Sequence, residues 1–443
     1  MNSSLQKIDT LIEAHWIIPV DPPHSVLSGH AVAVSDGCIV GVLPAAEAHK
    51  KFDAQQHIAL ADHVLIPGLV NLHTHAAMTL LRGLADDLTL MEWLNRHIWP
   101  AEQRHVSEEF VYDGTRLACA EMLRGGVTCF NDMYFFPRAA ARAAMEARMR
   151  AAIGLIVAEF PSPYAADAQD YLSKGLLVRD ALRGESLLTF CLAPHAPYSV
   201  SDKSLTDVAT YAGELDLPVH MHIHETLDEI TLSIKEHGMR PLQRLRQHGL
   251  LSPGLIAVHA IHLENNEIDL LARHGCHVVH CPSSNLKLAS GVAPIATLLT
   301  NNVNVGLGTD GAASNNRLDL FAEMRLAALL AKGMAGDAAT LPAWQALEMA
   351  TVRPARALGM DNLIGSLTPG KRADITAVSL SDIALAPCYD PLSHLVYAAG
   401  REHVSHVWVD GELVVDNGKL TTMDTQELRT KAAYWQAKIQ SQD

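Results

Sequence analysis

Two histidines one residue apart, His73 and His75, end an apolar run near the start of a chain that holds 24 histidines. Alternate side chains of a β-strand project to the same face, so both imidazoles can point to one place. Imidazole is the commonest metal ligand in proteins and an acid or base near neutral pH. Taken alone, the pair fits both a metal site and a chance spacing, and its position at a strand end favours the metal.

A second apolar segment carries three histidines on one face, His220, His222 and His224, with Glu225 directly after them. Three imidazoles are unfavourable in an apolar core, because each imidazole buried without a hydrogen-bond partner leaves polar nitrogens unsatisfied. A strand rises ~3.3 Å per residue, so the outer two are ~13 Å apart and all three cannot bind one ion. The spacing leaves open which of them does.

His259 and Asp310 end two further apolar segments. Asp310 could simply cap a helix, or its carboxylate could complete a metal sphere that begins at His73. Histidines and a carboxylate around an ion with an open position are typical of catalytic rather than structural zinc. Water on such an ion ionises near neutral pH and becomes a nucleophile. Glu225 and His259 are then placed to carry protons.

These residues lie at the ends of short apolar segments. The segments alternate regularly with longer helical stretches, which is the pattern of βα units. The helices expected include 138–150, opened by Pro137, and 201–215, capped by Ser201. We therefore expect an α/β fold, a (β/α)8 TIM barrel with its chemistry at the C-terminal ends of the strands. Eight strands are predicted, over residues 64–72, 127–131, 151–157, 187–193, 218–224, 255–259, 277–281 and 303–309.

Both ends of the chain read instead as short β-segments with turn signals, such as Ser35-Asp36-Gly37 and Asp410-Gly411. The simplest arrangement is one β-domain assembled from both termini, with the barrel inserted between them. We expect a small β-sandwich from residues 1–66 with 368–443, and the barrel over residues 67–367.

Composition excludes several classes of protein. A net charge of −15 without a basic cluster argues against a nucleic-acid partner. No apolar run approaches the ~20 residues of a membrane helix, and the start lacks a targeting pattern, so we expect a cytoplasmic protein with no membrane partner. The seven cysteines are scattered without a C-x-x-C pair, which argues against disulfides and a thiolate zinc site. The oligomeric state stays open, and a homo-oligomer is compatible with the sequence.

The motifs PGLVNLHTH (67–75), HIHE (222–225) and GTDGAASNN (308–316) resemble those of the amidohydrolase superfamily, and the resemblance spans nearly the whole chain. More narrowly, residues 78–94 and NLKLASG (285–291) resemble the 5′-methylthioadenosine/S-adenosylhomocysteine deaminases, near the triazine chlorohydrolases. The resemblance implies one divalent metal ion, zinc in the first place, with iron and manganese also suited to such ligands.

The resemblance also indicates which histidines bind the metal. It implies that Glu225 protonates the ring nitrogen of the substrate and that His259 orients the attacking water. Asp310 would bind both the metal and the substrate and would move the proton of the water. The implied metal ligands are His73, His75, His222 and Asp310.

Two further substrate contacts follow from the resemblance. Glu102, in WPAE (99–102), matches a carboxylate that binds the ribose hydroxyls, and two oxygens suit two vicinal donors. His195, in APHAPY (193–198), matches a histidine near the reacting ring, although it could instead only hold its loop. Without the resemblance, Glu102 would be read as a surface glutamate.

The implied function is hydrolytic deamination of a small-molecule nucleoside, releasing ammonia and the inosine analogue. Some relatives carry arginines after the third strand that bear on the carboxylate of S-adenosylhomocysteine, whereas residues 158–170 hold none. This difference favours adenosine or 5′-methylthioadenosine, whose 5′ ends are neutral. The apolar Met91, Trp93 and Leu94 are candidates for a thioether pocket.

Two alternatives remain at this point. One is a chlorohydrolase or another nucleobase deaminase, of the guanine, cytosine or triazine type. Glu102 argues against a triazine as the substrate, because a triazine has no ribose. The other is a catalytically silent barrel that serves as an assembly subunit. The sequence holds the complete set of candidate ligands and proton carriers, which argues against a silent barrel.

Overall fold

A parallel eight-stranded barrel forms the centre of the computed structural model, which describes residues 5–441. Its strands follow one another in chain order, each paired with its sequence neighbours. Six of the eight strands are buried along their whole length, as expected where helices cover a parallel sheet. The predicted barrel is thereby confirmed. The strands are β5 (Leu69–Thr74), β6 (Val127–Tyr134), β7 (Arg150–Val157), β8 (Leu188–Pro194), β9 (Val219–Ile223), β10 (Leu255–His259), β11 (His277–His280) and β12 (Asn304–Leu307).

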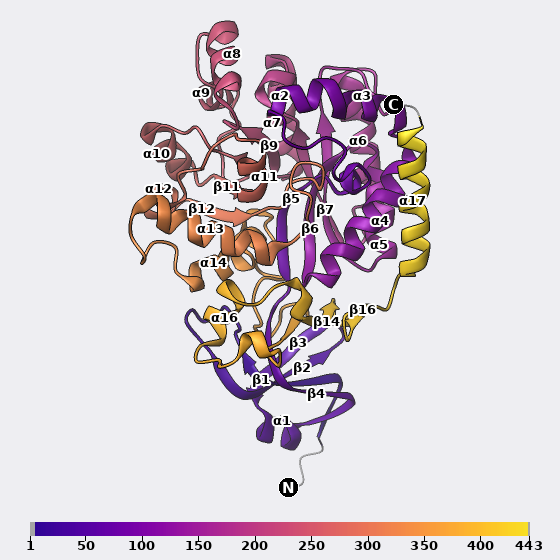
Figure 1. Ribbon diagram of the computed structural model, residues 1–443, viewed down its shortest axis with the longest axis vertical. Helices are drawn as coiled ribbons and strands as arrows, with labels where there is room; N and C mark the ends of the chain where they lie inside the picture. The colour runs from indigo at the N-terminus through magenta and orange to yellow at the C-terminus, as the bar shows by residue number, and fades with distance from the viewer. Residues whose placement is uncertain (1–4, 442–443) are drawn as a thin grey trace.

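Helices connect the strands and form an outer layer (Figure 1). Helix α7 begins after Ser201, whose hydroxyl accepts a hydrogen bond from the N–H of Ser204, and α5 begins at Pro137, both as predicted. The helices are α4 (Glu108–Arg124), α5 (Pro137–Glu146), α6 (Ala168–Leu182), α7 (Asp202–Leu215), α8 (Leu227–His237), α9 (Pro241–Gln247), α10 (Asn265–His274), α11 (Pro282–Lys287), α12 (Ile295–Thr300), α13 (Leu320–Ala335), α14 (Ala343–Met349) and α15 (Val352–Ala357).

The first and last barrel strands meet at their C-terminal ends. The backbone N–H groups of Thr309 and Asp310 donate to the carbonyl of His73, at 3.1 and 3.0 Å. The side chain of Asn71 bridges the same seam, because its amide donates to the Thr309 hydroxyl and its oxygen accepts from the Thr309 N–H. These bonds hold Asp310 beside His73.

A long connection follows β5 and covers one side of the barrel mouth. It contains the 3-10 helix η1 (Ala76–Leu81), α2 (Leu90–Trp93), the π-helical turn η2 (Leu94–Ile98) and α3 (Trp99–His105). Two shorter 3-10 turns, η3 (Pro197–Ser199) and η4 (Ile383–Leu385), lie in later connections.

Strands from both ends of the chain form the second unit, a mixed eight-stranded sheet beside the barrel (Figure 1). The N-terminal part joins the C-terminal part through antiparallel pairing of β4 with β13. The expected β-domain built from both termini is thus confirmed. Its elements are β1 (Gln6–Ile17), β2 (Leu27–Ser35), β3 (Cys38–Pro44), α1 (Ala45–Lys51), β4 (Phe52–Pro67), β13 (Ile375–Ser379), η5 (Arg401–His403), β14 (Val404–Val409), β15 (Glu412–Asp416) and β16 (Lys419–Leu420). Between β13 and β14, helix α16 (Pro391–Tyr397) packs against the barrel helices α13 and α14.

The predicted first barrel strand, 64–72, is corrected by the structure. Residues up to Pro67 belong to β4 of the terminal sheet, and the barrel strand starts at Leu69. Gly68 lies between them, where an added Cβ would overlap the side chain of Thr128 on β6. The chain therefore passes from the sheet into the barrel at a residue that has no side chain.

The C-terminal helix α17 (Thr425–Gln440) returns to the barrel and packs against α4 (Figure 1). The indole N–H of Trp435 donates to the Asp113 carboxylate at 2.9 Å.

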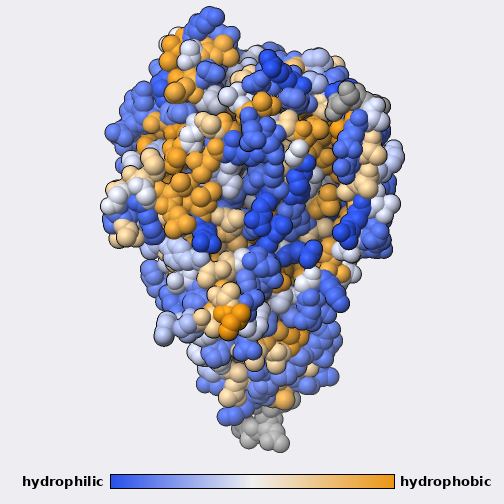
Figure 2. All heavy atoms as spheres, in the orientation of Figure 1, coloured by the Kyte–Doolittle hydropathy of each residue, from blue (hydrophilic) through white to orange (hydrophobic). Residues whose placement is uncertain are grey.

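Apolar atoms gather at the tip formed by α8, where Leu227 and Ile234 are exposed (Figure 2). Among residues 5–441, no helix combines the length and apolar character that crossing a membrane requires.

Candidate active site

A cavity opens at the C-terminal ends of the barrel strands. Its walls are mainly apolar with a few converging polar groups, which is the character of a small-molecule site. His73 is fully buried directly behind its wall, in ring contact with His75 and His222. The other seven candidate residues line the cavity: His75, Glu102, His195, His222, Glu225, His259 and Asp310.

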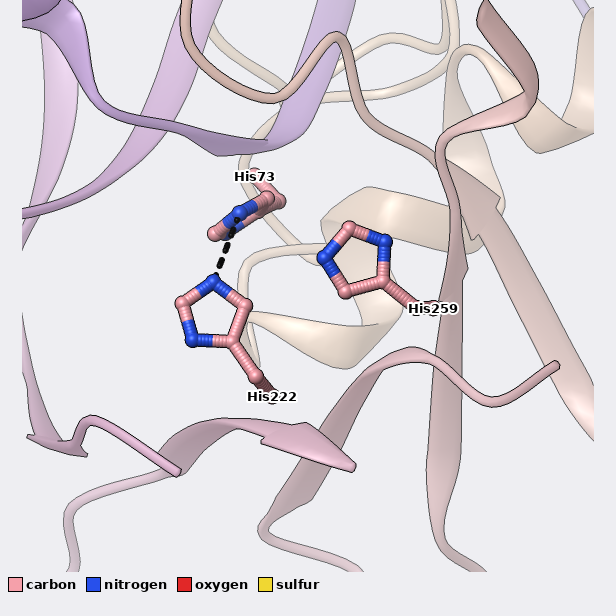
Figure 3. Close-up of side chains that lie close together, drawn as sticks. All are labelled: His73, His222 and His259. Carbon is pink, nitrogen blue, oxygen red and sulfur yellow. Dashed lines mark hydrogen bonds between the residues drawn. The ribbon is translucent and has the colours of Figure 1, made fainter. Parts of the chain in front are cut away.

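Four of these side chains converge on one point. The Nε2 atoms of His73 and His75 each lie 3.2 Å from Oδ1 of Asp310. The Nε2 of His222 lies 3.3 Å from the Nε2 of His73, as the dashed line in Figure 3 shows. His259 faces the same point from β10 (Figure 3).

The hydrogen bonds of the far ring nitrogens decide what these imidazoles offer to that point. The Nδ1–H of His75 donates to the Met133 carbonyl at 2.6 Å, and that of His222 donates to the His195 carbonyl at 2.7 Å. With Nδ1 protonated, Nε2 is in each ring the nitrogen that can bind an ion at the centre. Imidazole nitrogens that converge with a carboxylate oxygen on one point fit a divalent metal ion, which would displace a proton held between them.

Burial and charge set the protonation of these groups. Burial lowers the pKa of His73 to about 3, which keeps its imidazole neutral at pH 7. Burial would raise the pKa of Asp310, but the hydrogen bonds from His73 and His75 hold it well below its usual range. Burial also lowers the pKa of His75, but the bond to Asp310 outweighs it and raises the pKa to about 9. Metal binding at His75 therefore displaces a proton.

The three histidines of β9 have different surroundings. His222 points into the cavity, whereas His220 lies beneath it, with its Nε2 2.9 Å from the Nδ1 of His73. His224 points away, and its Nε2 accepts from the backbone N–H of Leu242 at 3.1 Å. Of the three, only His222 offers a nitrogen to the convergence point.

Unusual backbone conformations aim several of the polar side chains. Asp310, His259 and His224 have φ values of 60°, 70° and 57°, in the left-handed region, at the ends of their strands. Such conformations cost energy for non-glycine residues, and they cluster at functional sites. Here they turn the chain sharply where a strand would otherwise continue.

Glu225 and His259 lie beside the convergence point, with Oε1 of the glutamate 3.8 Å from Nε2 of the histidine. The Nδ1 of His259 lies 2.8 Å from Oδ1 of the Asn285 side chain, which can only accept, so Nδ1 carries the proton. Burial raises the pKa of Glu225, which favours its protonated form as a donor.

A second glutamate, Glu229, fixes the backbone that carries Glu225. Its two carboxylate oxygens accept from the N–H groups of His224 and Glu225, at 2.8 and 2.9 Å. Glu229 is buried in the first turn of α8, where Thr226 caps the helix. The start of α8 and the backbone of Glu225 are thus held by one carboxylate.

We expect Glu229→Gln to lower kcat by up to about 10²-fold with little change in KM, since a displacement of ~1 Å at a catalytic group has such an effect. Glutamine keeps the size of the side chain but offers one acceptor oxygen instead of two. Steady-state kinetics checks this result, with Glu236→Gln on the exposed side of α8 as the matched control. An unchanged kcat would show that Glu229 does not position Glu225.

Glu102 and His195 form the outer wall of the cavity. Tyr134 at the end of β6 donates its hydroxyl hydrogen to Glu102 at 2.7 Å. Burial raises the pKa of Glu102 to about 7, so hydroxyl donors from a ligand would stabilise its ionised form. Burial lowers the pKa of His195 to about 4, and its Nδ1 lies 2.9 Å from the Ser199 hydroxyl, which leaves Nε2 for a ligand.

Several residues of the site carry no strong sequence signal. Ser284 and Ser314 donate to Oδ2 of Asp310, at 2.6 and 2.8 Å, and so orient its other oxygen toward the histidines. Tyr134 and Asn285 act through Glu102 and His259 in the same way. A single serine, tyrosine or asparagine after a strand is too common to be noticed without the fold.

Residues 64–414 match the amidohydrolase family. The chain belongs to this family. The amidohydrolase is 49% identical over 434 residues to a 5-methylthioadenosine/S-adenosylhomocysteine deaminase of Saccharophagus degradans, covering 98% of this chain and 97% of that protein. The resemblance read from the motifs is confirmed by both findings.

Solved structures place the amidohydrolase among metal-containing relatives. An adenosine deaminase from Xanthomonas campestris with bound zinc superposes with a TM-score of 0.98 at 46% identity, over 99% of this chain and all of that one. An atrazine chlorohydrolase from Arthrobacter aurescens complexed with zinc has a TM-score of 0.88 at 24% identity, over 96% of this chain and 99% of that one. The second likeness concerns the fold alone.

Proposed function

We propose that this amidohydrolase hydrolyses the amino group from the purine ring of a 5′-modified adenosine, releasing ammonia and the inosine analogue. The preferred substrate is 5′-methylthioadenosine, with adenosine and S-adenosylhomocysteine as further candidates. One observation carries the proposal: the metal-ligand cluster, the proton donor Glu225 and the carboxylate Glu102 share a single cavity. The names of the related deaminases support the same reaction.

The metal ligands in this proposal are His73, His75, His222 and Asp310, whose donor atoms converge as a divalent cation requires. Zinc is the first choice, since the related adenosine deaminase has it bound, and iron or manganese would suit the same ligands. When bound, the ion lowers the pKa of a coordinated water toward neutrality and thereby supplies the nucleophile.

The chain's own residues direct the reaction. Glu225 donates a proton to the ring nitrogen beside the carbon that carries the amine, so that negative charge does not build up on the ring. His259, fixed by Asn285, hydrogen-bonds the attacking water through Nε2 and sets its direction. Asp310 accepts the proton of that water and passes it to the departing amine nitrogen.

Glu102 supports a nucleoside rather than a free base. Its carboxylate lies on the cavity wall, where burial favours a ligand that donates hydrogen bonds to it. The two hydroxyls of a ribose supply two such donors, and a carboxylate can accept both. A triazine supplies neither, which disfavours the chlorohydrolase alternative.

The walls near Glu102 suit a neutral, apolar 5′ end. Trp93 and Leu94 line the cavity, as does Phe160, whereas Met91 is not among its lining residues. A neighbouring hollow beside Glu102 is lined by Trp99, Phe135, Phe160 and prolines. Residues 158–170 contain no arginine for an amino-acid carboxylate. A methylthio group would bury its apolar surface here.

We expect Glu102→Gln to lower kcat/KM for 5′-methylthioadenosine by about 10–100-fold, because a hydrogen bond to a charged group contributes ~1.5–3 kcal/mol. The low rate with free adenine should not fall further, since adenine has no ribose. Glu108→Gln, an exposed glutamate on α4, is the matched control. An equal loss for the nucleoside and the free base would contradict the ribose assignment.

The silent-barrel alternative is disfavoured because both proton carriers and three of the four candidate ligands line the cavity, and the fourth, His73, lies directly behind its wall. We also propose that the enzyme is cytoplasmic. All seven cysteines are free, five of them buried, which suits a reducing compartment.

We propose two domains, a terminal β-domain from residues 1–66 with 368–443 and a barrel from residues 67–367.

A further inference from the structure

A second cluster of metal-ligating side chains lies in the terminal sheet, far from the barrel mouth. It consists of Glu13 on β1, His49 on α1 and His57 on β4, whose ligand atoms all lie within 4.8 Å of one another. In Figure 1, these three elements lie at the opposite end of the molecule from α8 and α9, the helices that follow β9. None of the three residues takes part in the proposed deamination.

The fold brings these residues together through strand register and helix packing. Strands β1 and β4 run parallel, with Leu11 paired to His57 and Glu13 to Ala59, so Glu13 and His57 share one face of the sheet. The short helix α1 packs on the same face through buried Ala48, next to Leu11. His49 follows Ala48 and therefore reaches the same place.

Both imidazoles aim the same nitrogen at a single oxygen atom. The Nε2 of His49 lies 2.7 Å from Oε1 of Glu13, and the Nε2 of His57 is in short contact with that same oxygen. The two rings are nearly perpendicular, with centroids 5.1 Å apart. Two independent ion pairs would more readily use the two oxygens of the carboxylate separately.

Ion pairing alone does not explain why both imidazoles approach the same oxygen atom of Glu13. Exposed ion pairs contribute little to stability, and each side chain loses rotamer freedom when it is held in place. Two imidazole nitrogens and one carboxylate oxygen are, by contrast, the donor set of many zinc sites with open positions. The side chains of His49 and His57 are 51% and 46% exposed, so water has access to complete the coordination.

We propose that Glu13, His49 and His57 form a second, surface metal site that takes a divalent transition-metal ion, zinc above all. Two imidazoles and one carboxylate favour zinc, nickel and copper over calcium and magnesium, which prefer oxygen ligands. The bound ion ties α1 and β4 to β1 and so stabilises the terminal sheet. Its occupancy is independent of the catalytic cluster and of the proposed deaminase reaction.

The test compares zinc binding by two double variants of the full chain. Protein with its catalytic cluster loaded is freed of weakly held metal on a chelating resin and then dialysed against zinc chloride, and bound zinc is measured by mass spectrometry. We expect the wild type to bind about one more equivalent per chain than the H49A/H57A variant. The matched control, H15A/H30A, removes two other histidines of the same sheet and should bind as the wild type does.

Thermal unfolding gives a second readout. Zinc should raise the melting temperature of the wild type beyond that of the H49A/H57A variant, because an ion bound only by the folded state stabilises it. Glu13→Gln, which keeps both histidines, should weaken the additional binding by at least about tenfold. Equal zinc content and equal melting shifts in wild type and H49A/H57A would overturn the proposal. Deaminase activity plays no part in either outcome.

Discussion

Replacement of Glu225 by glutamine is expected to lower kcat by about 10²–10⁴-fold while the protein keeps its catalytic metal. Glutamine has nearly the same shape, and the backbone N–H of residue 225 would still donate to Glu229. What the variant loses is the proton that the ring nitrogen needs as the water attacks. Turnover and metal content measured on the same preparation check this result.

The exposed Glu236→Gln variant of α8 serves again as the control and should match the wild type. A Glu225→Gln variant with near wild-type kcat would end the assignment of Glu225 as proton donor. A variant that lost its metal would instead show that Glu225 acts on the ligand cluster rather than on the substrate.

Replacement of His73 by alanine should remove about one equivalent of metal per chain and abolish measurable deamination together. His73 touches both other histidine ligands and bonds Asp310, so its loss opens the centre of the cluster. The surface cluster at Glu13 should keep its own ion. Metal analysis and activity assays on one preparation check both outcomes.

His73 is fully buried, so the variant needs a folding check by circular dichroism. Asp310→Asn provides a second variant of the same cluster that changes shape very little. His274→Ala, at the end of α10 outside the site, is the control. A folded His73→Ala protein with full metal content and full activity would contradict the ligand set.

The sequence predicted most of the fold because strand ends and strand periodicity are local features. Seven barrel strands lie within a few residues of the prediction. The first did not, since the run 64–72 is continuous in apolar character and only the close approach of Gly68 to Thr128 divides it. The long strand β4 and the helix α1 before it were not predicted, because the first half of β4 mixes polar and apolar residues without a regular alternation.

The candidate site was predicted less evenly. Residues at strand ends, such as His73 and Asp310, follow from the architecture, because parallel strands all end at one mouth. The choice of His222 came from a resemblance, since a period of two treats the three histidines of β9 alike. Supporting groups such as Glu229 and Tyr134 could not be found, because they act across turns that only the folded chain defines.

The most direct test of the proposed function is an ultraviolet deamination assay on the zinc-loaded enzyme with 5′-methylthioadenosine, adenosine, S-adenosylhomocysteine, guanine and a chlorotriazine. We predict ammonia release with 5′-methylthioadenosine, lost on treatment with a strong chelator and restored by zinc. Its kcat/KM should exceed that for S-adenosylhomocysteine, since residues 158–170 offer no arginine. Comparable kcat/KM for these two nucleosides would contradict the neutral 5′ pocket. Turnover of the chlorotriazine with no ammonia from any nucleoside would contradict the proposed function itself.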